Sequence, residues 1–379
     1  MKKVLLVGSS YSAVPLLYHL KSYGCTVGVC GNLERDQAIA HADSYHKLDY
    51  SKKEDLLALV ERERFDHIVP SCNDFSYLSC AWVADRLGYP GYDGYETAVT
   101  LHTKAAFRSF ALRNGLPVPN AVRPRFPVLV KPIDSFSGRG MTKVRGRDGL
   151  ARAVDHAKAN SRTGQYLIEE FVEGTLHSHS AFLAHGKITA DFFVDEYCKV
   201  YPYEVDCSCL SVALSEKTKD HVRQAVREML SLLRIENGLV HTQFVADRDR
   251  FWLIETMRRA PGDLYGRLVE LSTEAAYHKN YVSPFIGMKP PEKTRARRGH
   301  FFARHTVSSD ESGDFVSFSH DIPSRNVFIV PLKTSGQMLK AAPYDKVAIL
   351  FAGFQSLEDL SKYTPVLDSH VHIQTSGSN

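Results

Sequence analysis

The stretch from Val128 to Met141 constrains the fold of this 379-residue chain more than any other. An apolar run, Val128 to Val130, predicts a buried β-strand that ends in a lysine, Lys131. A proline then blocks extension of the strand. A lysine at a strand end supplies a point charge, and backbone N–H groups of a flexible loop can fold over an anion. The pattern indicates a polyphosphate site, with a plain hairpin turn as the local alternative. The small residues of the loop are Ser135, Ser137, Gly138 and Gly140, and Arg139 lies among them.

The N-terminal region predicts an α/β fold. Lys3 to Val7 and Thr26 to Val29 are apolar strands on either side of an apolar helix, Ser12 to Ser22. This βαβ succession predicts a parallel sheet, and His67 to Pro70 adds a later strand. The turn after the first strand lacks the Gly-x-Gly-x-x-Gly fingerprint, so a dinucleotide site is not supported.

Asn73 and Asp74 follow the strand that ends at Pro70. Ligands bind beyond the carboxyl ends of parallel strands, which makes both residues ligand candidates. Capping of the next helix by a short polar side chain is the favoured interpretation.

Composition narrows the class of protein. Hydrophobic residues make up 44% of the chain and charged residues 24%, and the net charge is +4, which is typical of a soluble globular protein and gives no support for nucleic-acid binding. No apolar run approaches the roughly 20 residues of a membrane span. The seven cysteines are odd in number and lack a Cys-x-x-Cys pair, which favours reduced thiols in the cytoplasm. Cys207 and Cys209 are the nearest pair, but a metal site needs more ligands than this stretch supplies.

Further motifs accompany the lysine strand in a fixed order. They are Lys104 and the exit Gly115 to Pro119 before it, and then YLIEEFVEG at Tyr166 to Gly174, HTQFV at His241 to Val245 and FWLIETMRRAPGD at Phe251 to Asp263. Over about residues 1 to 290 the ordered set resembles the ATP-grasp superfamily. The similarity is to its carboxylate–amine ligase branch, which includes the L-amino-acid ligases, D-alanine–D-alanine ligase and carbamoyl phosphate synthetase.

The resemblance implies an α/β fold built of α+β lobes. An N-terminal Rossmann-like domain with a parallel sheet precedes the ATP-grasp lobes, and a small β-rich piece ends the chain. The expected divisions are 1–92 for the N-terminal domain, 93–122 for linking helices, 123–175 for the small lid lobe, 176–290 for the catalytic lobe and 291–379 for the C-terminal β-rich subdomain and tail. The basic stretch Lys293 to Arg298 is interpreted as a surface linker.

The resemblance also implies that ATP and Mg²⁺ bind between the lobes. Lys104 and Lys131 would hold the α- and β-phosphates under a lid formed by Ser135 to Met141. Arg139 in that lid would contact a phosphate or the acyl group, or face solvent. The residues assigned to the nucleotide are Lys104, Lys131, Ser135, Ser137, Gly138, Gly140, Glu169, Glu170, Phe171, Val172 and His177.

The adenine hinge is expected to begin at Glu169 and Glu170. The resemblance implies that the carbonyl of Glu170 and the N–H of Val172 bond to the base, while Phe171 packs against it. The family's glutamate for the ribose is replaced here by Leu176. His177 is the candidate substitute, and a solvated loop histidine is the alternative.

The last two motifs contain the predicted metal ligands and the main catalytic candidate. Glu255 ends an apolar strand and is the best Mg²⁺ ligand, with Gln243 as the second. The family asparagine two residues later is Met257 here, a poor Mg²⁺ ligand. Either one metal ion lacks a protein ligand, or Asp247 or Asp263 compensates. The catalytic assignments are Arg259, which would stabilise the transferring phosphate, with Lys131 and Arg139. Arg258 is the alternative to Arg259 by one position.

These assignments predict a ligase that joins a carboxylate to an amine through an acyl phosphate and releases ADP and phosphate. An amino acid or an amino sugar is the expected acceptor, with Phe192 to Asp206 shaping its pocket and Asp263 contacting its amino group. The alternatives are an ATP-grasp carboxylase or phosphotransferase, or an ATP-binding protein without catalysis. A homodimer is compatible with the sequence. No nucleic-acid or membrane partner is expected.

Overall fold

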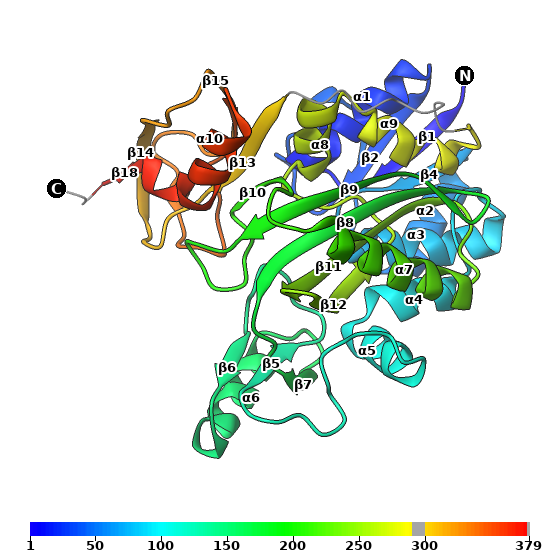
Figure 1. Cartoon of the computed structure of the whole chain (residues 1–379). Coiled ribbons are helices and arrows are strands. Elements are labelled where there is room, and N and C mark those ends of the chain that lie inside the picture. The colour runs from blue at the N-terminus through cyan, green and yellow to red at the C-terminus, as the bar shows by residue number, and fades with distance from the viewer. Residues whose placement is uncertain (290–299, 377–379) are drawn as a thin grey trace.

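The computed structural model describes residues 1–289 and 300–376 of the chain, and its elements are labelled in Figure 1. The first elements are β1 (Lys3–Val7), α1 (Val14–Ser22), β2 (Thr26–Gly31), β3 (Ser44–Lys47), α2 (Lys53–Glu63), β4 (His67–Pro70) and α3 (Asp74–Leu87). Their strands form a parallel sheet in the order β3-β2-β1-β4, as the βαβ pattern predicts. Leu6 of β1 joins an apolar cluster with Leu16 of α1, whereas Leu5 joins another with Leu56 of α2. Helices therefore cover both faces of this sheet.

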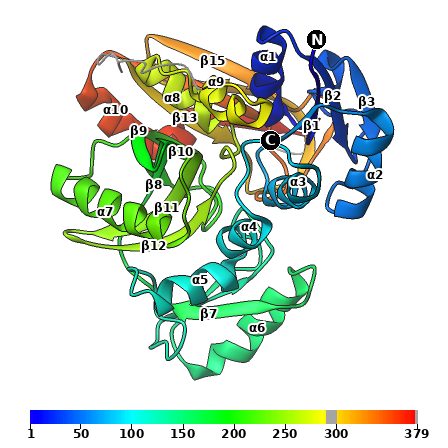
Figure 2. The same cartoon turned by 90° about the vertical axis from the view of Figure 1, so that its right-hand side faces the viewer.

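The small lobe follows two linking helices. The elements are α4 (Tyr95–His102), α5 (Lys104–Arg113), β5 (Val128–Pro132), β6 (Thr142–Val144), α6 (Leu150–Ala159) and β7 (Tyr166–Glu170). The strands are antiparallel in the order β6-β5-β7, and Val128 and Val130 of β5 pack with Ala153 and Ala157 of α6. Figure 2 shows α6 on the side of this sheet that is turned away from the rest of the molecule. Because side chains alternate along a strand, Lys131 points to the opposite side.

The part of the chain predicted to be the catalytic lobe is a long antiparallel sheet with helices on both faces. Its elements are β8 (Thr175–Ala184), β9 (Lys187–Tyr197), β10 (Cys207–Leu210), α7 (Glu216–Leu232), β11 (Gly238–Asp247), β12 (Arg250–Met257), α8 (Tyr265–Thr273) and α9 (Tyr277–Val282). Ser215 caps the N-terminus of α7, since its side chain accepts a hydrogen bond from the N–H of Thr218. Val222 of the helix packs with Phe244 of β11. Helices α8 and α9 pack on the other face, where Tyr277 meets the ring of Phe182.

The C-terminal elements continue this sheet. They are β13 (Phe301–Val307), β14 (Gly313–His320), β15 (Asn326–Pro331), β16 (Met338–Leu339), β17 (Ala348–Phe354), α10 (Leu357–Tyr363) and β18 (Val371–Thr375). Eight strands run in the order β12-β11-β8-β9-β10-β13-β17-β15, so the β-rich piece shares a backbone ladder with the catalytic lobe (Figure 1). The predicted boundary at 291 and the linker Lys293–Arg298 lie outside the described residues, and the division into domains stays a prediction. Within the described part of the chain, no helix combines the length and apolarity that a membrane crossing requires.

Candidate functional site

Gln243 of β11 and Glu255 of β12 lie directly opposite each other on paired strands. The register shifts at this point, because Phe244 pairs with Leu253 and Ile254 is an extra residue of β12. Bulges of this kind re-aim side chains next to binding sites. Phe244 and Leu253 are buried in the core under α7, whereas the Glu255 side chain is 30% exposed. The bulge therefore presents the predicted metal-binding pair at an accessible edge.

Lys104 is the first residue of α5, and its ammonium group reaches two other elements. Nζ donates to the carbonyl oxygen of Ser135 at 2.6 Å and lies 4.0 Å from Glu255 Oε2. The structure thus brings together three residues that the sequence predicts as nucleotide or metal contacts. A cation between the lid loop and a metal-binding acid is placed to hold a phosphate.

Lys131 is buried in an ion network. Its Nζ lies 2.5 Å from Glu169 Oε1, and the other oxygen of Glu169 accepts from Arg108, 2.9 Å from Nε and 2.8 Å from Nη2. Arg108 also donates to the carbonyls of Leu253 and Ile254 at 3.0 and 3.2 Å, which ties the small lobe to β12. Burial raises the pKa of Glu169, but the two cations outweigh it and hold that pKa below its usual value.

The side chain of Glu169 therefore has a role that the sequence did not reveal. It faces Lys131 rather than an adenine site, and it orients that ammonium group. Arg108 completes the network and was missed altogether. It lies on a helix 61 residues before Glu169, and an isolated arginine in a helix carries no local signal of such a partner.

After Glu169 the backbone N–H groups are hydrogen-bonded as far as Phe171. The N–H groups of Glu170 and Phe171 donate to the carbonyls of Asn120 and Pro127, both at 2.8 Å. Within the described residues the N–H of Val172 has no hydrogen-bond partner. The hinge therefore offers an open donor at the position predicted to bond to adenine.

The lid is a tight turn that depends on left-handed backbone. The φ values of Ser137, Gly138 and Gly140 are +54°, +69° and +73°, and Ser135 Oγ closes the turn by donating to the carbonyl of Arg139 at 3.0 Å. A Cβ atom on Gly138 would lie 2.4 Å from the carbonyl oxygen of Pro202. Only glycine allows the lid to approach the loop that follows β9 so closely.

Arg139 lies away from the predicted phosphate contacts. Its Nη2 donates to the carbonyl of Pro343 at 2.8 Å, and the guanidinium group lies 4.8 Å from the ring centres of both Phe136 and Tyr344. The side chain thus docks the lid onto the C-terminal piece. In this arrangement the Arg139 side chain is not brought together with Lys104 and Glu255, and its contact with a phosphate or the acyl group stays a prediction.

The two adjacent arginines have different partners. Arg259 donates from Nε and Nη2 to the two oxygens of Asp74 at 2.9 and 3.0 Å, and His102 Nδ1 lies 2.8 Å from Asp74 Oδ1. Burial raises the pKa of Asp74, but Arg259 and His102 hold it well below its usual range. Arg258 is buried and pairs with Asp93 at 2.6 Å. Its other donors bond to the carbonyls of Asn237 and Leu239.

Asp74 therefore orients the guanidinium group of Arg259. The neighbouring Asn73 is the N-cap of α3 and accepts from the N–H of Ser76 at 2.9 Å, as the capping interpretation predicts.

The predicted acceptor side is a second charged cluster. Asp263 Oδ1 and Oδ2 lie 2.6 and 2.7 Å from Lys346 Nζ, and the hydroxyl of Tyr11 donates to the same carboxylate. Arg304 donates to the Asp263 carbonyl at 3.0 Å, and Glu204 lies 4.0 Å from Lys346. The sequence predicted Asp263 and the segment that contains Glu204, but not the three partners from distant parts of the chain.

Gln243 has a carboxylate partner that was not predicted. Its Nε2 lies 2.7 Å from Oε2 of Glu196 on β9, and burial raises the pKa of Glu196. A carboxylate oxygen turns the amide nitrogen toward itself, so the amide oxygen of Gln243 is left for another partner. Met257 is buried, and Asp247 pairs with Arg250 at the end of the hairpin. Neither residue joins Glu255.

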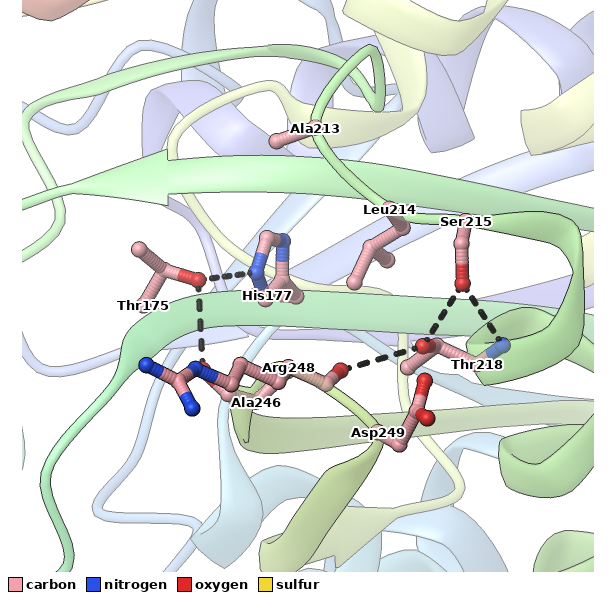
Figure 3. Close-up of a pocket in the computed structure, with 9 residues that line it drawn as sticks. All are labelled: Thr175, His177, Ala213, Leu214, Ser215, Thr218, Ala246, Arg248 and Asp249. Carbon is pink, nitrogen blue, oxygen red and sulfur yellow. Dashed lines mark hydrogen bonds between the residues drawn. The ribbon is translucent and has the colours of Figure 1, made fainter.

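His177 lies on the other face of the sheet. Its ring stacks on Phe244, its Nε2 is 2.6 Å from Thr175 Oγ1, and its Nδ1 is 2.8 Å from Asp195. Phe244 packs in the core under α7 and is the neighbour of Gln243 in β11, so the two side chains point to opposite faces. Figure 3 shows His177 in a pocket of about 260 Å³ that opens beside the start of α7. The structure therefore does not bring His177 together with the nucleotide candidates.

Comparison with known proteins relates this geometry to a family model and to curated relatives. A model of the ATP-grasp domain matches residues 124–265. The chain is 30% identical over 186 residues to the formate-dependent phosphoribosylglycinamide formyltransferase of Parasynechococcus marenigrum, covering 45% of this chain and 48% of that protein. The match to the Synechococcus sp. (strain WH7803) protein of the same name is 29% identical over 332 residues and covers 84% of each. The first match thus spans about half of the relative's length.

Solved structures agree with the chain over nearly its whole length. An L-amino acid ligase from Bacillus licheniformis has a TM-score of 0.80 at 18% identity, covering 100% of this chain and 99% of that one. A phosphoribosylglycinamide synthetase from Anaerococcus prevotii has a TM-score of 0.77 at 15% identity, covering 99% and 100%. At such identities the likeness concerns the fold, and it confirms the predicted α/β architecture.

Proposed function

We propose that this chain, which belongs to the ATP-grasp superfamily, is an ATP-dependent carboxylate–amine ligase that forms an amide bond and releases ADP and phosphate. The observation that carries the proposal is the position of Lys104. Its ammonium group lies between the lid carbonyl of Ser135 and the carboxylate of Glu255. Phosphoryl transfer depends on such positioning of cations around the phosphates.

The residues of this edge fit a magnesium nucleotide. Lys131 uses one of its three N–H donors on Glu169, which leaves donors for phosphate oxygens. Glu255 and the amide oxygen of Gln243 are hard oxygen ligands on facing residues, as Mg²⁺ requires. The bound ion would neutralise phosphate charge. The open N–H of Val172 and the apolar Leu176 suit the base and sugar, without a polar ribose contact from His177.

The proposed reaction gives Arg259 a role in phosphoryl transfer. A carboxylate resists an amine because its leaving group would be oxide, whereas an acyl phosphate has a good leaving group. The phosphoryl group gathers charge as it transfers, and a guanidinium group fixed in advance stabilises that charge. Asp74 fixes Arg259 through two hydrogen bonds. The lid, docked through Arg139 on Pro343, would exclude water from the acyl phosphate.

The substrate class follows from the second charged cluster and from the relatives. We assign the acceptor amine to the cluster of Asp263, Lys346 and Glu204, with an amino acid or an amino sugar as the expected compound. Relatives and structural neighbours are named for formate-dependent formyl transfer and for L-amino acid ligation. A small carboxylate is therefore the expected partner substrate. A cytoplasmic location and a homodimer are parts of the same proposal.

One observation favours a second candidate, an ATP-binding protein without catalysis. Met257 is 5% exposed and packs in the interior, so no carboxamide stands two residues after Glu255. If one metal ion were lost for this reason, the nucleotide would bind without transfer.

The deciding experiment measures phosphate release from Mg²⁺-ATP with pairs of small carboxylates and amines, with bicarbonate alone in a separate reaction. Release that needs both substrates, together with a condensed product by mass spectrometry, supports the ligase. Bicarbonate-dependent release would indicate a carboxylase. ATP binding without release in any reaction would favour the second candidate, and Met257→Asn is then the first variant to test for gain of turnover.

A further inference from the structure

Three buried side chains with metal-binding chemistry meet where β10 joins β13. They are Asp206, Cys207 and His305, with exposures of 2%, 0% and 2%. Cys207 and His305 are direct cross-strand partners, and Cys207 Sγ lies 3.1 Å from His305 Nδ1. One ligand atom from each of the three residues lies within 4.8 Å of the others. The sequence shows only Cys207 and its neighbour, because His305 lies 98 residues away.

Asp206 has an unpaired oxygen in this cluster. Its Oδ2 accepts from the N–H groups of Lys199 and Val200 at 2.6 and 2.7 Å. Its Oδ1 is buried and has no hydrogen-bond partner in the described part of the chain. Buried polar atoms are nearly always paired, and an orphaned carboxylate oxygen is costly. Beside a thiol and an imidazole, it points to a cation.

In a second cluster of possible metal ligands, both carboxylate oxygens have protein partners. His19, Glu270 and His278 also bring ligand atoms together. Glu270 Oε1 accepts from His278 Nδ1 at 2.9 Å and from its N–H at 3.1 Å, and Oε2 lies 3.6 Å from Arg267. Both oxygens are thus paired by protein groups. The difference singles out the Asp206 cluster.

We propose that Asp206, Cys207 and His305 bind one zinc ion that joins the catalytic lobe to the C-terminal strands. Tetrahedral zinc with typical Zn–S and Zn–N bonds separates the two ligand atoms by about 3.5 Å, close to the observed 3.1 Å. A thiolate and a carboxylate neutralise the charge of the ion, and a neutral imidazole adds none. Binding releases the thiol proton to solvent as the zinc–sulfur bond forms. A water molecule would take the fourth position.

The position of the site gives it a structural consequence. Asp206 holds the base of the loop through Lys199 and Val200, and Pro202 in the same loop meets Gly138 of the lid. An ion at Asp206 would therefore fix the loop on which the lid docks. This inference is independent of the proposed ligase activity.

The test measures metal binding by the full-length protein, purified without a histidine tag. After incubation with zinc and dialysis, mass spectrometry should find one zinc per wild-type chain. Cys207→Ala and Asp206→Asn should each lose it, and His278→Gln should retain it as the matched control. Cobalt in place of zinc should give a thiolate-to-metal charge-transfer band in the wild-type protein.

Several results would contradict the zinc site. A wild-type protein that retains no zinc, or whose cobalt form lacks the thiolate band, overturns the proposal. Zinc retained by both cluster variants, or lost only in His278→Gln, overturns it as well. The cobalt spectrum needs no variant, so the proposal stays testable if Cys207→Ala does not fold.

Discussion

The proposed phosphate end and the proposed acceptor end of the site are assembled differently. Lys104 begins α5, and Lys131 and Glu255 lie near the ends of β5 and β12, in segments that the sequence marks by itself. The acceptor end joins Asp263 to Lys346, 83 residues later, and to Tyr11, 252 residues earlier. Phosphate chemistry is shared by many enzymes and rests on local motifs, whereas a particular substrate is recognised by groups that only the tertiary fold collects. Single substitutions at the two ends can test that contrast.

Glu169→Gln should give the largest loss of stability. It leaves Lys131 and Arg108 with buried, uncompensated charges, which costs about 3–5 kcal/mol of the free energy of unfolding. Urea unfolding checks this. Glu173→Gln is the matched control, because its ion pair with Lys143 is exposed and its loss should cost at most about 1 kcal/mol. Equal losses in the two variants would contradict the buried network.

The stability difference between wild type and Glu169→Gln should also depend on pH. The pKa of Glu169 lies below its usual value of about 4.3, so its contribution to stability is complete above that pH. The contribution is lost as pH falls through the lower, folded-state pKa. The stability gap between wild type and Glu169→Gln should therefore be constant near neutral pH and narrow in acid. A gap that widens on acidification would reverse the sign of the linkage.

Arg259→Ala should lower kcat for ligation about 10²–10³-fold, because it removes charge stabilisation from phosphoryl transfer. Arg258→Ala should keep turnover per folded molecule while losing stability, since Arg258 braces Asp93 and two backbone carbonyls. Steady-state kinetics normalised to folded protein separates the two effects. Equal residual activity in both variants would contradict the assignment of Arg259 to phosphoryl transfer.

Asp263→Asn should raise the KM for the amine about tenfold, close to 1.4 kcal/mol, and leave the KM for ATP unchanged. The carboxylate faces Lys346 and the predicted acceptor, not the phosphate residues. Asp43→Asn is the control, because it removes an exposed pair with Lys21. A matching rise in the KM for ATP would show that the two ends of the site are not separable.

Ser215→Ala should have the smallest effect, about 1 kcal/mol of stability, from loss of the N-cap of α7. The cap lines the same pocket as His177 (Figure 3), and Glu255 is not among the residues that line it. Thermal unfolding should shift while both KM values stay the same. An altered KM for ATP would place nucleotide binding on the α7 face after all.

The sequence predicted the parallel sheet, the lysine strand and the glycine turn, and it singled out Lys104 and Glu255 as candidates, because each depends on local pattern and on the family order of motifs. It could not predict the partner of Glu169, since Arg108 is a solitary charge on another element. His177 was placed on the wrong face because side chains alternate, so that a single position in a strand decides the side. The docking of Arg139 on Pro343 joins residues 204 positions apart, which no local pattern encodes.

The shared ladder of β10 and β13 has a consequence for how the chain can be divided. In the intact protein β10 is an interior strand, with β9 on one side and β13 on the other. A chain cut before β13 would expose the free N–H and C=O groups of β10 as an open sheet edge. Open edges template pairing between molecules and lead to aggregation. The C-terminal strands thus shield the catalytic lobe from its own copies, and a truncated enzyme would be expected to precipitate before it could be assayed.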